Sequence, residues 1–99
     1  MKALFISLNT EPYEAFKLGS KIIEWRIYGK RWNERTCTPG RGCIISKGYG
    51  KKDRLTGVVL SITKHQIDDP THIFNRFFAE KSKGQIAAAI SIKVVHHGL

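Results

Sequence analysis

The clearest structural pattern in the chain is Gly19-Ser20-Lys21-Ile22-Ile23-Glu24-Trp25-Arg26-Ile27-Tyr28. A glycine after a short apolar run commonly ends a helix, and alternating apolar and polar residues are typical of a strand. Odd positions from 23 to 27 carry aliphatic or indole side chains, and even positions from 24 to 28 carry polar ones. We expect the face with Trp25 to pack on the core, while Glu24 and Arg26 point together to the far side and Lys21 stands at the start of the strand.

Apolar patterns on both sides of this stretch predict the remaining elements. We expect strands at 3–8, 22–28, 43–46, 55–63 and 86–95, and helices at 12–18 and 70–83. This order favours an α+β fold over residues 1–99, built as a small mixed β-barrel or strongly curved sheet of about five strands with two short helices. The expected core contains Phe5, Ile23, Trp25, Ile45, Val59, Phe74, Phe77 and Ile90.

Length and composition indicate one domain. The 99 residues, 41% of them apolar, suffice for one compact core and not for two. The first apolar run is too short for a signal peptide, and no segment approaches the roughly 20 apolar residues of a membrane span. We therefore expect a cytoplasmic protein with no membrane partner.

The two cysteines predict no metal centre. Cys37 and Cys43 lie in a segment rich in glycine, and their spacing is not that of a zinc knuckle. The four histidines are scattered or close to the C-terminus. We expect ordinary thiols, no metal and no cofactor.

Positive charge is concentrated in the first half of the chain. Between Lys17 and Arg54, eleven basic side chains accompany three acidic ones, a net +8 of the total +9. A block of one sign attracts polyanions, and aromatic rings among cations can stack on unpaired bases. RNA or another single-stranded nucleic acid is the expected partner, unless the cations decorate a loop and the aromatics belong to the core. The candidate binding residues are Lys21, Glu24, Arg26, Tyr28, Arg31, Trp32, Arg41, Lys47, Tyr49, Lys51, Lys52 and Arg54.

The chain resembles the ASCH domain, a member of the PUA-like superfamily. The resemblance rests on an early strand ending in Ser7-Leu8, a helix started by a proline, the Gly-x-Lys-x-x-Glu-x-Arg run at 19–26, and Gly57-Val58-Val59. It implies a small PUA-like barrel, a cleft between the barrel and the first helix that the motif residues line, and a role in RNA metabolism.

The resemblance also implies a hydrolase as an alternative. Some ASCH proteins are acetylcytidine amidohydrolases that use the motif lysine, a threonine three residues later and a distant glutamate. Lys21 matches the lysine, Glu24 occupies the threonine position, and Glu80 is the candidate for the distant acid. Other members are metal-dependent ribonucleases. Lys21 and Glu24 are accordingly the candidate catalytic residues on RNA or a modified nucleoside.

The residues themselves allow two readings of the motif. Lys21, Glu24 and Arg26 could form an ion-pair cluster that only holds the strand to the end of the helix. They could also recognise the edge of a nucleobase, with Glu24 accepting a hydrogen bond from an exocyclic amine. The hydroxyls of Ser7, Ser20 and Ser46 are the available serine nucleophiles for a hydrolase.

Overall fold

The computed structural model describes residues 2–66 and 85–97. Its elements are β1 (Leu4–Leu8), α1 (Thr10–Leu18), β2 (Ile23–Ile27), β3 (Gly42–Lys47), β4 (Arg54–Gln66) and β5 (Ile86–His97). The predicted order of strand, helix and three strands is confirmed, as is a further strand from Ile86. The helix expected at 70–83 lies outside the described residues. Within the described part of the chain, no helix is long and apolar enough to cross a membrane.

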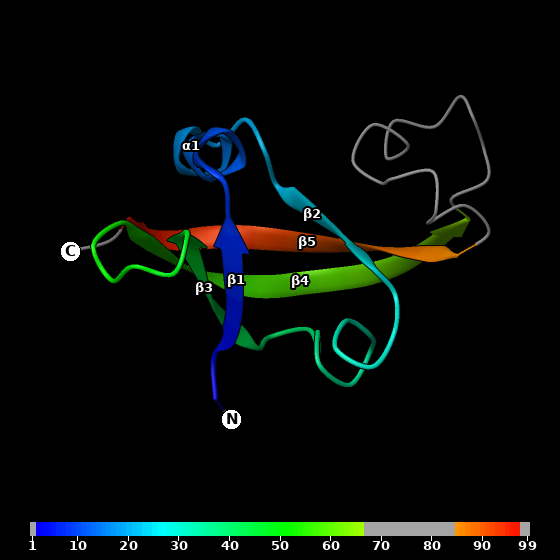
Figure 1. The fold of residues 1–99 in the computed structure, drawn as a ribbon. Helices are drawn as coiled ribbons and strands as arrows, with labels where there is room; N and C mark the ends of the chain where they lie inside the picture. Colours follow the sequence, from blue (N-terminus) through cyan, green and yellow to red (C-terminus); the bar gives the residue numbers. More distant parts are fainter. Residues whose placement is uncertain (1, 67–84, 98–99) are drawn as a thin grey trace.

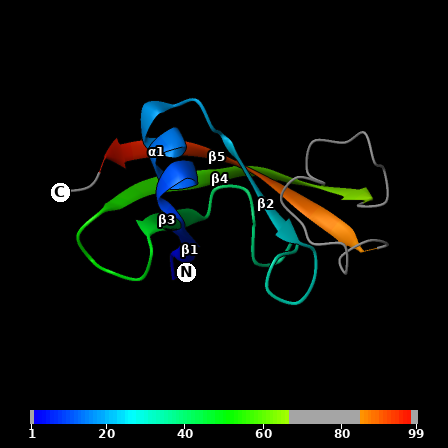
Figure 2. The same cartoon turned by 45° about the horizontal axis from the view of Figure 1, so that its top comes forward.

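The strands form a mixed sheet in the order β1-β3-β4-β5-β2, which curls into a half barrel (Figures 1 and 2). Only the β1–β3 pair is parallel, and the other pairs described are antiparallel. The short strands β1 and β2 are therefore the two edges of the sheet. In Figure 1, α1 runs from the end of β1 toward the start of β2 and lies across the open side.

Two irregularities curve the long β4–β5 ribbon. The register shifts between Thr56 and Gly57 and again between Val59 and Ser61. These shifts leave Val95 and Leu60 without a paired residue, and both side chains are more than half exposed. Bulges bend a strand and increase its twist. At the first bulge, a Cβ on Gly57 would lie 2.8 Å from the main-chain oxygen of Lys93, so only glycine fits this close approach.

The main core lies on the concave face of the sheet. It includes Ile6 from β1, Phe16 from α1 and Ile92 from β5, each no more than 1% exposed. The prediction of a core role for Ile45, Val59 and Ile90 is confirmed. The predicted core residues at 74 and 77 lie outside the described part of the chain.

The alternation of β2 was predicted correctly, but its two faces were assigned the wrong way round. Glu24 pairs with Ile90, so both side chains point into the half barrel, and Glu24 is 6% exposed. Trp25 and Ile27 pack instead in a small separate cluster around Ala87 on the opposite face. The alanines of β5 explain this arrangement, because they leave room beside β2 for the larger side chains.

Two further core assignments need correction. Ile23 is half-buried and is not among the residues of the main core. Phe5 is also half-buried, and its ring lies on the other face of β1 against Tyr49, 6.2 Å between centroids. Alternation along β1 buries Leu4, Ile6 and Leu8 and therefore leaves Phe5 outside.

Gly19 ends α1, as the sequence predicted. It adopts a left-handed conformation with φ of 82°, which a residue with a Cβ reaches only at a cost. The main-chain N–H groups of Ser20 and Lys21 then donate to the carbonyl oxygen of Ala15 at 3.0 and 3.1 Å. The helix begins at Thr10, and Asn9 occupies the N-cap position without a capping hydrogen bond from its side chain.

Candidate functional site

A cleft of about 750 Å³ opens between α1 and β2. One wall comes from the end of β1 and the first turns of α1, the other from β2, and the β3–β4 turn closes one end. This is the size range of pockets that hold small ligands. The cleft is lined by Ser7, Leu8, Asn9, Glu11, Pro12, Ala15, Lys21, Glu24, Trp25, Arg26, Gly48 and Tyr49.

Lys21 reaches the cleft from the end of α1. Its main-chain N–H is bound to Ala15, so the helix terminus determines where the side chain starts. The Nζ atom lies 5.4 Å from the centroid of the Phe16 ring and 3.6 Å from Oε1 of Glu24. The lysine side chain is 19% exposed, so its ammonium is partly shielded from water and directed at the carboxylate.

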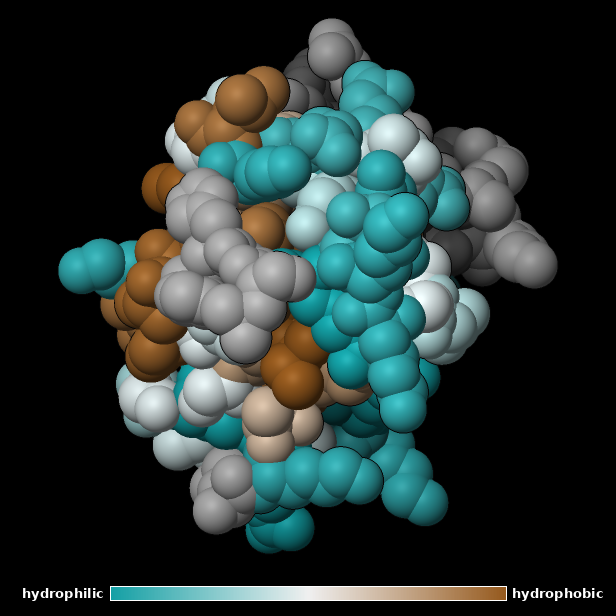
Figure 3. All heavy atoms as spheres, turned by 90° about the vertical axis from the view of Figure 1, so that its left-hand side faces the viewer, coloured by the Kyte–Doolittle hydropathy of each residue, from teal (hydrophilic) through white to brown (hydrophobic). Residues whose placement is uncertain are grey.

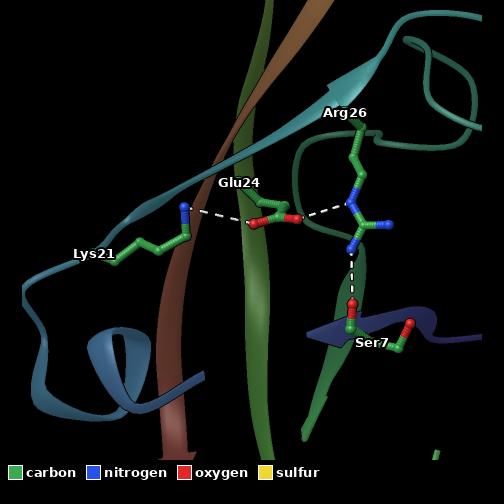
Figure 4. A network of polar contacts seen from close by, with 4 residues as sticks. All are labelled: Ser7, Lys21, Glu24 and Arg26. Atoms are coloured by element: carbon green, nitrogen blue, oxygen red, sulfur yellow. Dashed lines mark hydrogen bonds and ion pairs between the residues drawn. The ribbon is translucent and has the colours of Figure 1, made fainter. Parts of the chain in front are cut away.

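Glu24 is a buried carboxylate between two cations. Its Oε1 faces Lys21, and its Oε2 accepts a hydrogen bond of 2.7 Å from Nε of Arg26. A buried charge is costly unless it is paired and hydrogen-bonded, and here each oxygen has a cationic partner. Figure 4 shows the three side chains in a row, with the carboxylate in the middle.

Arg26 connects the two edges of the sheet. While Nε binds Glu24, Nη2 donates to the main-chain oxygen of Ser7 in β1 at 2.9 Å (Figure 4). The guanidinium also lies 4.7 Å from the centroid of the Trp32 ring. Ala88, its neighbour on β5, is fully buried and small enough to leave room for it. Arg26 is thus held on several sides and fixes the orientation of Glu24.

The row of Lys21, Glu24 and Arg26 alternates in hydrogen-bonding character. Both cations can only donate, and an ionised carboxylate can only accept. Each carboxylate oxygen has two lone pairs, so one cationic contact per oxygen leaves room for a further donor from a ligand. The three groups carry a net charge of +1. The row can therefore bind the polar edge of a ligand without repelling a nearby phosphate.

Tyr49 stands at the mouth of the cleft on the β3–β4 turn. It is 82% exposed, and its ring stacks on Phe5 with 24° between the planes. The Cζ atom of Arg54 lies 5.3 Å from the centroid of the Phe5 ring, and its Nε donates to the main-chain oxygen of Gly50. Lys51 and Lys52 are exposed on the same turn. The end of the molecule that bears this turn shows hydrophilic residues on one side and hydrophobic residues on the other (Figure 3).

Three of the predicted binding residues belong to the segment after β2 and do not line the cleft. Trp32 is only 7% exposed and belongs to the main core, so its indole is not a stacking surface for a base. Arg31 is exposed, and its Cζ atom lies 5.3 Å from the centroid of the Trp32 ring. The Tyr28 hydroxyl donates to Glu34, and this hydrogen bond raises the pKa of Tyr28 and lowers the pKa of Glu34.

Two further predicted cations have structural partners. Arg41 donates from Nε and Nη2 to the main-chain oxygen of Lys2 and from Nη1 to that of Thr36, so it ties the start of the chain to the loop before β3. Lys47 lies 3.7 Å from Glu14 and 3.8 Å from Asp53. Neither residue lines the cleft.

The candidate serines and the two cysteines give little support for a second reactive site outside the cleft. Ser46 is buried and donates to Gly50, and the hydroxyl of Ser20 donates to Ala15, whereas Ser7 lines the cleft. Cys37 and Cys43 are buried free thiols. Across residues 2–66 and 85–97, no three His, Cys, Asp or Glu side chains are grouped closely enough to hold a metal ion. Glu80 lies outside the described residues.

The resemblance implied a cleft beside the first helix, but the residues that β1 and α1 contribute to its wall were not among the predicted binding residues. Asn9 and Glu11 belong to no motif, Pro12 was noted only as the start of a helix, and Ser7 contributes its main-chain oxygen, which every residue possesses. They reach the site because β1 pairs in parallel with β3 and so becomes the edge opposite β2. Besides the resemblance, the glycine that ends α1 before Lys21 was a local signal that the helix lies beside the motif.

Comparisons with solved structures find the same fold. The chain superimposes on the hypothetical protein PH0355 with a TM-score of 0.67 and 22% identity, over 95% of this chain and 100% of that one. The ASCH protein of Zymomonas mobilis superimposes with a TM-score of 0.59 and 18% identity, over 94% of this chain and 67% of that one. Protein PF0455 of Pyrococcus furiosus superimposes with a TM-score of 0.57 and 25% identity, over 95% of this chain and 98% of that one.

Sequence-based comparisons give no further assignment. No family model matches the chain, and a search of curated proteins finds no match. The structural likeness covers nearly the whole chain. The chain therefore has an ASCH-like fold.

Proposed function

We propose that the protein binds single-stranded RNA and holds one unpaired nucleotide in the cleft between α1 and β2. The observation that carries this proposal is the position of an exposed aromatic ring, Tyr49, and a polar row, Lys21 to Arg26, around one cleft. Recognition of unpaired bases commonly combines an aromatic stacking surface with hydrogen bonds to the base edge. A single-stranded ligand is favoured over a duplex because only an unpaired base exposes both its face and its edge.

The surroundings of the cleft suit a phosphate backbone. Lys51 and Lys52 are exposed on the turn that bears Tyr49, and Arg54 follows at the start of β4. Cations at these positions would contact phosphates on either side of a bound nucleotide, whereas Glu24 sits deeper and faces the base. The expected division is that the turn supplies affinity and the polar row supplies selectivity.

A binding assay with Tyr49 variants tests the proposal. Stacking of one base on an aromatic side chain contributes about 1–3 kcal/mol, so Tyr49→Ala should weaken binding of a short single-stranded RNA about tenfold or more. Tyr49→Phe keeps the ring and should bind like the wild type. Tyr49→Phe should retain the melting temperature, and Tyr49→Ala should lower it only slightly, through the loss of its stack on Phe5. No measurable RNA binding by the wild type, or equal binding by Tyr49→Ala, would contradict the proposal.

A hydrolase acting on RNA or a modified nucleoside is the second candidate, favoured by the presence of Lys21 and Glu24 in the same cleft. Its difficulty is the nucleophile. Ser7 and Lys21 lie at opposite ends of the polar row, separated by Glu24 and Arg26 (Figure 4). Incubating end-labelled RNA and acetylated nucleosides with wild-type and Lys21→Ala protein decides between the two. Turnover that Lys21→Ala abolishes would favour the hydrolase.

A further inference from the structure

The two oxygens of Glu24 form the centre of the polar row, and their arrangement bears on which base the cleft accepts. A carboxylate offers two acceptors side by side in one plane and no donor. Nε of Arg26 donates to Oε2 at 2.7 Å, and Nη2 donates to the main-chain oxygen of Ser7. Arg26 is therefore held in place itself and fixes the plane of the carboxylate. A base that uses both oxygens must present two adjacent N–H donors.

Among the four RNA bases, only guanine presents two such donors on its Watson–Crick edge. Its N1–H and its 2-amino group lie next to each other, at a spacing that matches the two oxygens of a carboxylate. Adenine and cytosine each offer one amino donor beside a ring nitrogen that accepts. Uracil offers one N–H between two carbonyl oxygens. Each of these three bases would place a lone pair against an oxygen of Glu24, which is repulsive.

The third group in the row completes the match. Next to N1–H, guanine has the acceptor O6, and next to Oε1 of Glu24 stands the Lys21 ammonium at 3.6 Å. An ammonium carries three N–H groups, so it can bind the carboxylate and a carbonyl oxygen together. The order donor, acceptor, acceptor along Lys21, Oε1 and Oε2 is the order that cytosine presents to guanine in a base pair.

We propose that the cleft selects guanine, with Glu24 accepting from N1–H and the 2-amino group and Lys21 donating to O6. The proposal rests on the proposed function, because it names the base that the same cleft takes from single-stranded RNA. Tyr49 would stack on the purine, and the exposed cations of the turn would contact the flanking phosphates. Arg26 is a positioning residue, since it acts through Glu24. Glu24 thus accepts from a ring N–H as well as from an exocyclic amine.

The test uses short single-stranded RNAs of uridine whose central position carries guanosine, inosine, 1-methylguanosine or adenosine. Inosine lacks the 2-amino group, and 1-methylguanosine lacks the N1–H, while both keep O6 and the phosphates. Guanosine should bind about ten times more tightly than adenosine, with inosine between them and 1-methylguanosine no better than adenosine. Labelled RNA and fluorescence anisotropy give the four dissociation constants.

Two variants separate base recognition from general affinity. Glu24→Gln replaces one acceptor by a donor and should abolish the preference for guanosine, whereas Lys52→Ala should weaken all four RNAs equally. A melting curve shows whether Glu24→Gln folds. If it does not, the dissociation constants of the wild type for the inosine and 1-methylguanosine RNAs still test the selection of guanine.

The outcomes also separate the two proposals. Equal binding of all four RNAs, or preference for another base, would overturn the selection of guanine and leave RNA binding intact. Absence of binding to any of them would overturn the proposed function itself, and the inference with it.

Discussion

Nη2 of Arg26 in β2 donates to the main-chain oxygen of Ser7 in β1, at 2.9 Å. These strands are the two edges of the sheet, at opposite ends of the strand order. A side chain thus links the edges across the opening of the half barrel. The same guanidinium binds Glu24, so the link that joins the edges also orients the candidate recognition group.

Removing this guanidinium should destabilise the protein strongly. Arg26→Met keeps an apolar side chain next to Trp32 but leaves the buried carboxylate of Glu24 with one cation fewer and Ser7 without its donor. Hydrogen bonds to charged groups and broken buried ion pairs suggest a loss of about 2–4 kcal/mol in the free energy of unfolding. Urea denaturation measures it. The control, Arg31→Met, removes an exposed guanidinium from the same indole and should cost under about 1 kcal/mol. Equal losses in both variants would show that Arg26 has no special structural role.

Gly57 should tolerate no side chain. Gly57→Ala would place a methyl group 2.8 Å from Lys93 O and 3.1 Å from Cγ2 of Ile92, so the β4–β5 bulge would have to move. A cost of about 2 kcal/mol or more in unfolding free energy is expected. Gly42→Ala is the matched change in β3, where the nearest atom is 4.0 Å away, and it should be nearly neutral. Thermal melting of the two variants compares them, and similar melting temperatures would contradict the close approach at the bulge.

Alkaline pH should destabilise the fold through Cys43. Burial raises the pKa of this thiol from 9.0 to about 11. Because the folded state holds the proton more tightly than the unfolded state, the stabilisation is complete below about pH 9 and is lost as the pH rises toward 11. Between pH 8 and 10.5, wild-type protein should therefore lose about 2 kcal/mol more than Cys43→Ala, measured by urea denaturation at each pH. The same loss in both proteins would mean that Cys43 does not titrate in this way.

Salt should weaken RNA binding through the exposed lysines of the turn. If Lys52 contacts a phosphate, Lys52→Ala should lower the slope of log affinity against log salt concentration by about one unit. Arg41→Met offers a contrast, because its guanidinium is bound to the main chain at Lys2 and Thr36. That variant should lose stability and keep the slope. Binding that does not respond to salt, or an unchanged slope in Lys52→Ala, would argue against phosphate contacts on this turn.

The sequence predicted the elements well and the sides of β2 poorly, for a physical reason. Alternation shows that Glu24 and Trp25 point to opposite faces, and hydrophobicity then favours burial of the indole. The structure buries Glu24 because Lys21 and Arg26 compensate its charge, and this compensation depends on the end of α1 and on the opposite edge strand. Trp25 instead covers Ala87 on the other face. Contacts between elements decide such cases, and a local pattern does not contain them.

The candidate cations show the same limit. Charge density predicted a basic region but could not separate cations with main-chain partners, such as Arg41, from exposed ones, such as Lys52. Likewise, Trp32 and Tyr49 are both aromatic residues among cations, yet the first is 7% exposed and the second 82%. The motif at Lys21, Glu24 and Arg26 was identified from its residues because all three lie within one turn and one short strand.

An NMR titration shows whether an unpaired nucleotide occupies the cleft. Uniformly ¹⁵N-labelled protein is titrated with a short single-stranded RNA that contains one guanosine, and the amide signals are followed. We expect the largest shifts at residues 7–9, 21–26 and 48–50, and small shifts at 60–64 on the far part of β4. Shifts confined to the charged residues 51–54, or spread over the surface without a maximum at the cleft, would contradict it.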